Sequence, residues 1–161
     1  MCRTDSTSAD APTDSFNRDD SLVLGGEWAT VGNWGIFNGT AALSEPEPSG
    51  SLSAATLEVG SPDADVSSKL LGIDGDGGLV FRYTDPSNYG LLVPQPTFGT
   101  WSIRIVVGGS VVEERNIGLR NTAEGTLAGI VTNGQELTVL LNNQIAYQFD
   151  MPAGLEGTRF G

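Results

Sequence analysis

The strongest constraint on the fold is a stretch of sequence in which side chains alternate in character and then meet a turn. Residues 79–84 alternate with the period of a β-strand, so that one face takes Leu79, Phe81 and Tyr83 and the other takes Val80, Arg82 and Thr84. The run Asp85-Pro86-Ser87-Asn88 then breaks the pattern with residues typical of turns. A return strand is expected from Tyr89 to Val93. The stretch therefore predicts two antiparallel strands joined by a short turn.

Short apolar runs separated by turn residues continue along the rest of the chain. Asn38-Gly39, Gly108-Gly109 and Asn133-Gly134 suit the positive φ values of tight hairpin turns. No long run of helix-forming residues has helical spacing, so an all-β domain follows. Many short strands with Gly, Pro and Asn between them are typical of a sandwich or barrel.

Two sequence patterns carry a resemblance to a known family. Residues 78–89 read G-L-V-F-R-Y-x-D-x-x-N-Y, which resembles the central hairpin of concanavalin A-like (laminin-G-like) jelly rolls. Residues 14–28 resemble the opening of the same domains, with D-x-F-x-R-x-D-S followed by L-G-x-x-W. The resemblance covers about residues 14 to 161 and implies a two-sheet antiparallel β-sandwich, the concanavalin A-like jelly roll. Such domains occur in secreted bacterial glycan-binding modules and in bacteriophage tail or fibre proteins.

The chain of 161 residues divides into two parts of unequal size. Residues 1–13 are polar and small and are expected to form a flexible arm without a core of its own. Residues 14–161 are expected to form one sandwich domain. The start of the chain lacks the apolar segment of a signal peptide, so the protein is expected to stay in its cell, leave by lysis, or come from a longer precursor.

The charge balance excludes two classes of partner. The formal net charge is −12, Lys69 is the only lysine, and the arginines are scattered singly. Without a basic stripe the chain is not expected to bind nucleic acid. An anionic membrane surface would repel it for the same reason, and no apolar run is long enough to span a bilayer.

The acidic and nucleophilic residues do not form a recognisable catalytic set. Histidine is absent, which removes Ser-His-Asp and Cys-His arrangements. Glucanases with this jelly roll place three acids as E-x-D-x-(x)-E along one strand, whereas Glu113 and Glu114 are adjacent and point to opposite faces. We therefore expect a protein that is not an enzyme.

One acidic loop is a candidate metal site. Asp74 and Asp76 alternate with glycines in Asp74-Gly75-Asp76-Gly77-Gly78, a pattern that can direct carboxylates at calcium. The loop lacks the later glutamate of an EF-hand, and an ordinary acidic turn explains it as well. Apart from calcium at this loop, the sequence predicts no cofactor.

Residues in and directly after the hairpin 79–93 form a candidate surface for glycan or partner contact. Phe98 within the loop 94–100 and Trp101 directly after it are expected to form an exposed aromatic patch. Polar side chains that could orient a ligand nearby are Arg82, Asn88, Tyr89 and Gln95. A subunit interface would use similar residues. Trp28, Trp34 and Phe81 are instead expected to fill the core.

These observations favour a non-enzymatic bacteriophage virion component, either tail-associated or displayed on the particle surface. Its expected partners are other virion subunits or copies of itself, with host cell-surface glycan as a further ligand. The alternative is a carbohydrate-binding module of a secreted bacterial protein, which would place the chain outside the cell. A glycoside hydrolase ranks third.

Overall fold

The computed structural model describes residues 14–38, 40–44, 52–70, 77–118 and 125–161. Within these ranges the chain forms strands, turns and one short 3₁₀ helix, η1 (Pro96–Phe98). The expected arm 1–13 and the acidic loop with Asp74 and Asp76 lie outside the described residues. The described part of the chain contains no helical segment that could reach across a bilayer.

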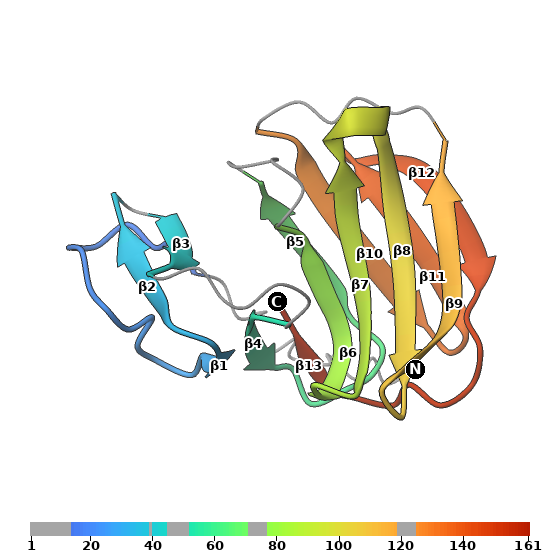
Figure 1. The fold of residues 1–161 in the computed structure, drawn as a ribbon, viewed down its shortest axis with the longest axis horizontal. Coiled ribbons are helices and arrows are strands. Elements are labelled where there is room, and N and C mark those ends of the chain that lie inside the picture. The colour runs from blue at the N-terminus through green and yellow to red at the C-terminus, as the bar shows by residue number, and fades with distance from the viewer. Residues whose placement is uncertain (1–13, 39, 45–51, 71–76, 119–124) are drawn as a thin grey trace, which may run out of the picture.

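The larger of two facing sheets has seven antiparallel strands (Figure 1). In spatial order they are β1 (Ala29–Val31), β4 (Ala54–Glu58), β13 (Arg159–Phe160), β6 (Leu79–Asp85), β7 (Asn88–Gln95), β8 (Thr100–Val107) and β9 (Ser110–Ile117). β13 is therefore an interior strand, bonded to β4 on one side and to β6 on the other.

The smaller facing sheet has four antiparallel strands, in the order β12 (Gln144–Asp150), β11 (Glu136–Leu141), β10 (Leu127–Asn133) and β5 (Asp65–Lys69). A separate pair, β2 (Trp34–Phe37) and β3 (Thr40–Leu43), lies beside the sandwich next to β1, at the left of Figure 1. The prediction of an all-β, two-sheet antiparallel sandwich is confirmed, and the β2–β3 pair is an addition to it.

The main core lies between the two sheets. Its strands contribute alternate residues, as the strand period requires. Its largest fully buried members are Leu79, Phe81, Leu92, Trp101, Ile103, Ile105, Ile130, Leu137, Val139 and Leu155. Gly90 on β7 is buried opposite Phe81, and a Cβ at this position would overlap the Phe81 ring. The glycine therefore provides the space that lets the aromatic ring lie flat in the core.

The predicted faces of β6 are correct only as far as Phe81. The register between β6 and β7 shifts between Phe81 and Asp85, and Arg82 adopts a φ of 47°. A β-bulge places one extra residue in a strand and reverses the alternation beyond it. Tyr83 accordingly joins Val80 and Ala54 in a second apolar cluster instead of the main core. The prediction that Tyr83 shares a face with Leu79 and Phe81 is therefore wrong.

Candidate functional site

The predicted aromatic patch is not formed. Trp101 is 0 % exposed and belongs to the main core, because it lies on the inward face of β8 with Ile103 and Ile105. Its indole N–H has no acceptor within the described chain. The predicted exposure of Trp101 is therefore wrong. Phe98, which is 68 % exposed on η1, stands without it.

The predicted polar residues lie at opposite ends of β7. Asn88 begins the strand and Gln95 ends it, so seven residue steps of about 3.3 Å separate them by roughly 23 Å. Asn88 is occupied by the turn, since its amide nitrogen donates to Asp85 and its oxygen accepts from the Gly108 N–H. Tyr89 packs against the second apolar cluster. The structure does not bring these side chains together, and their contact roles stay predictions.

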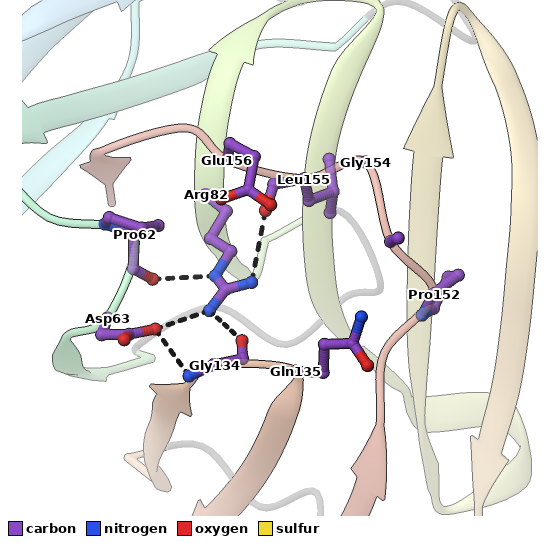
Figure 2. A pocket seen from close by; sticks show the side chains of 10 residues that line it. Pro62, Asp63, Arg82, Gly134, Gln135, Pro152, Gly154, Leu155 and Glu156 are labelled. Carbon is purple, nitrogen blue, oxygen red and sulfur yellow. Dashed lines mark hydrogen bonds and ion pairs between the residues drawn. The ribbon is translucent and has the colours of Figure 1, made fainter.

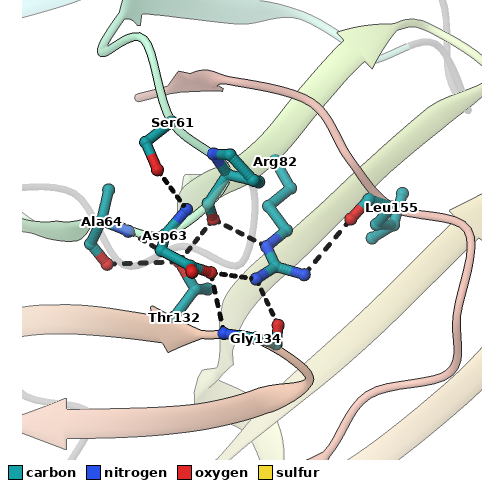
Figure 3. Close-up of polar contacts among 8 residues, drawn as sticks. Ser61, Asp63, Ala64, Arg82, Thr132, Gly134 and Leu155 are labelled. Atoms are coloured by element: carbon teal, nitrogen blue, oxygen red, sulfur yellow. Dashed lines mark hydrogen bonds and ion pairs between the residues drawn. The ribbon is translucent and has the colours of Figure 1, made fainter.

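The Arg82 side chain enters the sandwich, and its predicted role in orienting a ligand stays a prediction. The bulge directs the guanidinium between the sheets, where its side chain is only 6 % exposed. Nε donates to the carbonyl of Pro62 (2.8 Å) and Nη1 donates to the carbonyl of Leu155 (3.2 Å). Nη2 donates to Asp63 Oδ1 (2.8 Å) and to the carbonyl of Gly134. One arginine thus connects a strand of the larger sheet to three separate loops (Figure 3).

Asp63 and Thr132 complete this polar network. Asp63 Oδ1 accepts from Arg82 and also from the Gly134 N–H at 2.9 Å. The Thr132 hydroxyl is buried, donates to the carbonyl of Pro62 at 2.8 Å and accepts from the Ala64 N–H at 3.0 Å. Because charged groups form the stronger hydrogen bonds, the network fixes the loop before β5 against the turn between β10 and β11. We call this set (Arg82, Asp63, Thr132 and their backbone partners) the Arg82 network.

A cavity of about 200 Å³ opens beside the Arg82 network (Figure 2). Three loops form its wall: the loop before β5, the β10–β11 turn, and the segment 152–156 between β12 and β13. Its polar side chains are Asp63, Arg82, Gln135 and Glu156. Gln135 and Glu156 are exposed, and no described residue pairs with either side chain. We call it the Arg82 cavity.

The Arg82 cavity combines one spare donor with several free acceptors. Arginine has five N–H donors. The four bonds of Arg82 occupy one on Nε, one on Nη1 and two on Nη2, which leaves one N–H on Nη1. Figure 2 shows this nitrogen on the side of the guanidinium that faces Gln135 and Pro152. Asp63 Oδ2 and the Glu156 carboxylate can accept, and the Gln135 amide can do both.

The charges of the Arg82 cavity favour an uncharged ligand. Asp63 and Glu156 carry two negative charges against the single positive charge of Arg82, in a chain with net charge −12. An anion would therefore meet repulsion. Among the residues that the structure describes, no three acidic or cysteine side chains gather as a metal would require. A ligand with several hydroxyl groups matches the donors and acceptors that remain.

Sequence reasoning identified one member of this cavity and missed the others. Arg82 is recognisable as the single charged residue within the alternating run 79–84. Asp63, Gly134 and Leu155 lie 19, 52 and 73 residues from it along the chain. Glu156 is adjacent to Leu155 and is equally remote. Contacts at such separations depend on how the two sheets face each other, and no local motif announces them.

Comparison with known proteins gives one informative match. No protein-family model matches the chain, and no curated protein does either. Among solved structures, the carbohydrate-binding module CBM66 from Bacillus subtilis superposes with a TM-score of 0.58 at 18 % sequence identity. The match covers 83 % of this chain and 85 % of that one. At this level of identity the likeness shows a shared fold.

Proposed function

We propose that this chain is a non-catalytic carbohydrate-binding module and that the Arg82 cavity is its binding site. One observation carries the proposal: a buried arginine with one N–H left over faces free carboxylate and amide groups across a small cavity. The fold shared with a carbohydrate-binding module supports it. The proposal agrees better with the alternative prediction from the sequence, a carbohydrate-binding module, than with the prediction of a virion component.

Sugar hydroxyl groups both donate and accept hydrogen bonds, and the Arg82 cavity offers partners of both kinds. The remaining N–H on Arg82 Nη1 can donate to a hydroxyl oxygen, while Asp63 Oδ2 and Glu156 can accept hydroxyl protons. Bonds to charged groups are stronger than bonds between neutral groups. A few well-placed polar groups in a concave site are what fixes the orientation of a small ligand.

The Arg82 network also reduces the conformational entropy that the loops lose when a ligand binds. Ligand-binding loops that order on binding lose conformational entropy, which subtracts from the affinity. Here the loop before β5 and the β10–β11 turn are already joined through Asp63, Arg82 and Thr132. The volume of about 200 Å³ is below the roughly 300 Å³ at which ligand pockets usually begin. The cavity therefore suits a single sugar unit.

Several expectations from the sequence accompany this proposal unchanged. The concanavalin A-like classification and a calcium site at Asp74 and Asp76 stay predictions. So does the location of the protein, in a virion or outside the cell. A carbohydrate-binding module in a phage particle would bind host-surface glycan, so the proposed binding activity is compatible with either location.

The test uses two substitutions at the rim of the Arg82 cavity. Glu156→Gln and Gln135→Ala change exposed side chains that form no hydrogen bond or ion pair with a described residue, so the fold should be unaffected. Binding is measured on an array of immobilised neutral oligosaccharides and then by calorimetry with the best ligand. Each substitution is expected to weaken binding about tenfold, the effect of losing one charge-assisted or well-placed hydrogen bond.

A matched control is Asp19→Asn, which neutralises an exposed acid outside the Arg82 cavity. This variant should bind like the wild type. Equal affinity in Glu156→Gln, Gln135→Ala and the wild type would exclude the Arg82 cavity as the site. Absence of any glycan signal from the wild type would overturn the proposed function itself.

A further inference from the structure

A second cavity lies beside β1, at the edge of the sandwich, and is lined by residues between Leu22 and Trp34. Its volume is about 310 Å³, larger than that of the Arg82 cavity. The loop 22–26, strand β1 and the turn between β1 and β2 contribute to it. Its principal side chains are Leu22, Val23, Trp28, Thr30, Asn33 and Trp34. We call it the tryptophan groove.

Both tryptophans of the groove are held by their indole N–H groups. Trp28 Nε1 donates to Asp14 Oδ2 at 2.9 Å, and Trp34 Nε1 donates to the carbonyl of Val31 at 3.1 Å. Trp28 also packs on Phe16, with ring centroids 5.4 Å apart. With the N–H groups occupied inside the protein, the tryptophans offer the groove their ring carbons in fixed orientations. This differs from the expectation that Trp28 and Trp34 fill the core.

The groove is open on one side. Leu22 and Val23 are 76 % and 66 % exposed, among the highest values for large apolar side chains in the described residues. A Cβ placed on Gly25 or on Gly26 would meet no atom within 4 Å. Aromatic and aliphatic surface of this kind is normally covered when a protein meets its partner.

The lack of charge and the free polar groups of the tryptophan groove indicate the chemistry of its ligand. None of the residues lining the groove is charged, although the whole chain has a net charge of −12. Thr30 and Asn33 are exposed at its rim, and no described residue bonds to either side chain. A purely apolar partner would leave these hydroxyl and amide groups without hydrogen bonds. A ligand with one apolar face and several hydroxyl groups would satisfy both parts of the groove.

We propose that the tryptophan groove is a second sugar-contact site, which stacks the C–H face of a neutral saccharide on Trp28 and Trp34. Thr30 and Asn33 then bond to the hydroxyl groups at the edge of the same sugar unit. This inference rests on the proposed function, but it uses a different binding mode from the Arg82 cavity. One site binds by charge-assisted hydrogen bonds and the other by stacking on aromatic rings.

The experiment uses tryptophan fluorescence, because a sugar in the tryptophan groove should change the emission of Trp28 and Trp34 but not that of the buried Trp101. The chain has three tryptophans, and Trp101 is 0 % exposed in the core. The probe is the neutral oligosaccharide that gives the strongest signal on an array of glucan, mannan, galactan and fructan fragments. Its addition is expected to shift the emission of the wild type. Trp34→Ala should weaken binding about tenfold, as expected for loss of an aromatic anchor.

A second variant tests the tryptophan groove even if Trp34→Ala fails to fold. Val23→Glu adds a charge at an exposed position and leaves the core intact. It should also weaken binding by about tenfold, because a carboxylate would have to lose water beneath the sugar. The matched control is Ile145→Ala, which removes an aliphatic side chain that is 64 % exposed on β12 and lines neither cavity. This control should bind like the wild type.

The outcomes separate the two proposals. Wild-type affinity in both Trp34→Ala and Val23→Glu, together with weaker binding in Glu156→Gln, would overturn the groove and leave the proposed function standing. Weaker binding in the groove variants alone would support the groove and exclude the Arg82 cavity. If Trp34→Ala changes only the molar mass measured by light scattering, the groove is a contact between copies of the chain and the inference fails. No binding of any fragment to the wild type would overturn both.

Discussion

The Arg82 guanidinium lies 2.8 Å from the Asp63 carboxylate, yet the two groups differ sharply in exposure, with 6 % for the arginine side chain and 46 % for the aspartate. The ion pair is therefore anchored on the side of the arginine and open to solvent on the side of the aspartate. This asymmetry makes the arginine the structural member of the pair and leaves part of the aspartate for a ligand.

Replacement of Arg82 should destabilise the fold strongly. Arg82→Ala removes four hydrogen bonds and leaves the carbonyls of Pro62, Gly134 and Leu155 without this donor. Breaking a buried charge pair typically costs 3–5 kcal/mol, and the partial exposure of Asp63 puts the expected loss near the lower end, about 3 kcal/mol. The free energy of unfolding in urea measures it. Arg104→Ala is the control, since its pair with Glu114 is exposed on both sides and should contribute less than about 1 kcal/mol.

Thr132→Val should show whether the Arg82 network affects ligand binding without contacting the ligand directly. The substitution keeps the shape of the side chain but removes a buried hydroxyl that bonds to Pro62 and Ala64. Loss of about 1–2 kcal/mol in unfolding free energy is expected, because the Ala64 N–H loses its acceptor. Thr132 is not among the residues that line the Arg82 cavity. If the Arg82 network positions the ligand, glycan affinity measured well below the unfolding midpoint should also fall, and unchanged affinity would argue against that coupling.

Gly90→Ala should overpack the main core. A Cβ at this position would overlap the ring of Phe81 on the neighbouring strand. Forcing extra volume into a packed core typically costs 1–3 kcal/mol. Thermal unfolding should show a lower midpoint, and adding Phe81→Leu should recover part of the loss. Gly118→Ala is the control, because a Cβ there would meet nothing within 4 Å; a similar loss in both variants would contradict the steric explanation.

Asp14 should make the stability of the segment that carries the tryptophan groove depend on pH. Bonds from Arg18 at 2.7 and 3.0 Å hold the pKa of the Asp14 carboxyl well below its usual range, and burial opposes this effect. A group whose pKa is lower when folded stabilises the protein above its unfolded pKa, about 3.9 for aspartate, and loses that contribution as the pH falls.

The test compares the wild type with Asp14→Asn by thermal unfolding between about pH 7 and pH 3. The gap in unfolding midpoint should be widest at neutral pH and should narrow as the solution becomes acidic. Asp19→Asn serves as the control, since this exposed acid takes no part in the hydrogen bonds of Asp14 with Arg18 and Trp28 and should show no such gap. A gap that stays constant across the range would mean that the Asp14 charge does not contribute.

The sequence predicted much of the sandwich because strand alternation is a local signal. On β11, Leu137, Val139 and Leu141 are buried while the residues between them are less so, as their spacing indicates. The bulge at Arg82 was not predictable in the same way, since a reversal of faces arises from the pairing of β6 with β7. Trp101 was misplaced for a related reason: the loop before it suggested exposure, but its place in β8 determines its burial.

The candidate site was harder to predict than the fold. The Arg82 cavity joins residues from four parts of the chain, and only Arg82 lies in a recognisable pattern. In the tryptophan groove the two aromatic residues were assigned to the core, because a tryptophan in a short strand is more often buried. The hydrogen bonds that hold these half-buried indoles involve Asp14 and the Val31 carbonyl, and no periodic pattern reveals them.

The interior place of β13 has a consequence for biosynthesis. Strands β1 and β4 are translated early and β6 to β9 follow, but residues 159–160 must be made before the two groups can be hydrogen-bonded into one continuous layer. Until then the sides of β4 and β6 that face β13 present unpaired backbone groups, which are prone to aberrant association with other chains. The larger sheet therefore becomes continuous only after residues 159–160 have been synthesised, and until then the facing edges of β4 and β6 can pair with other chains.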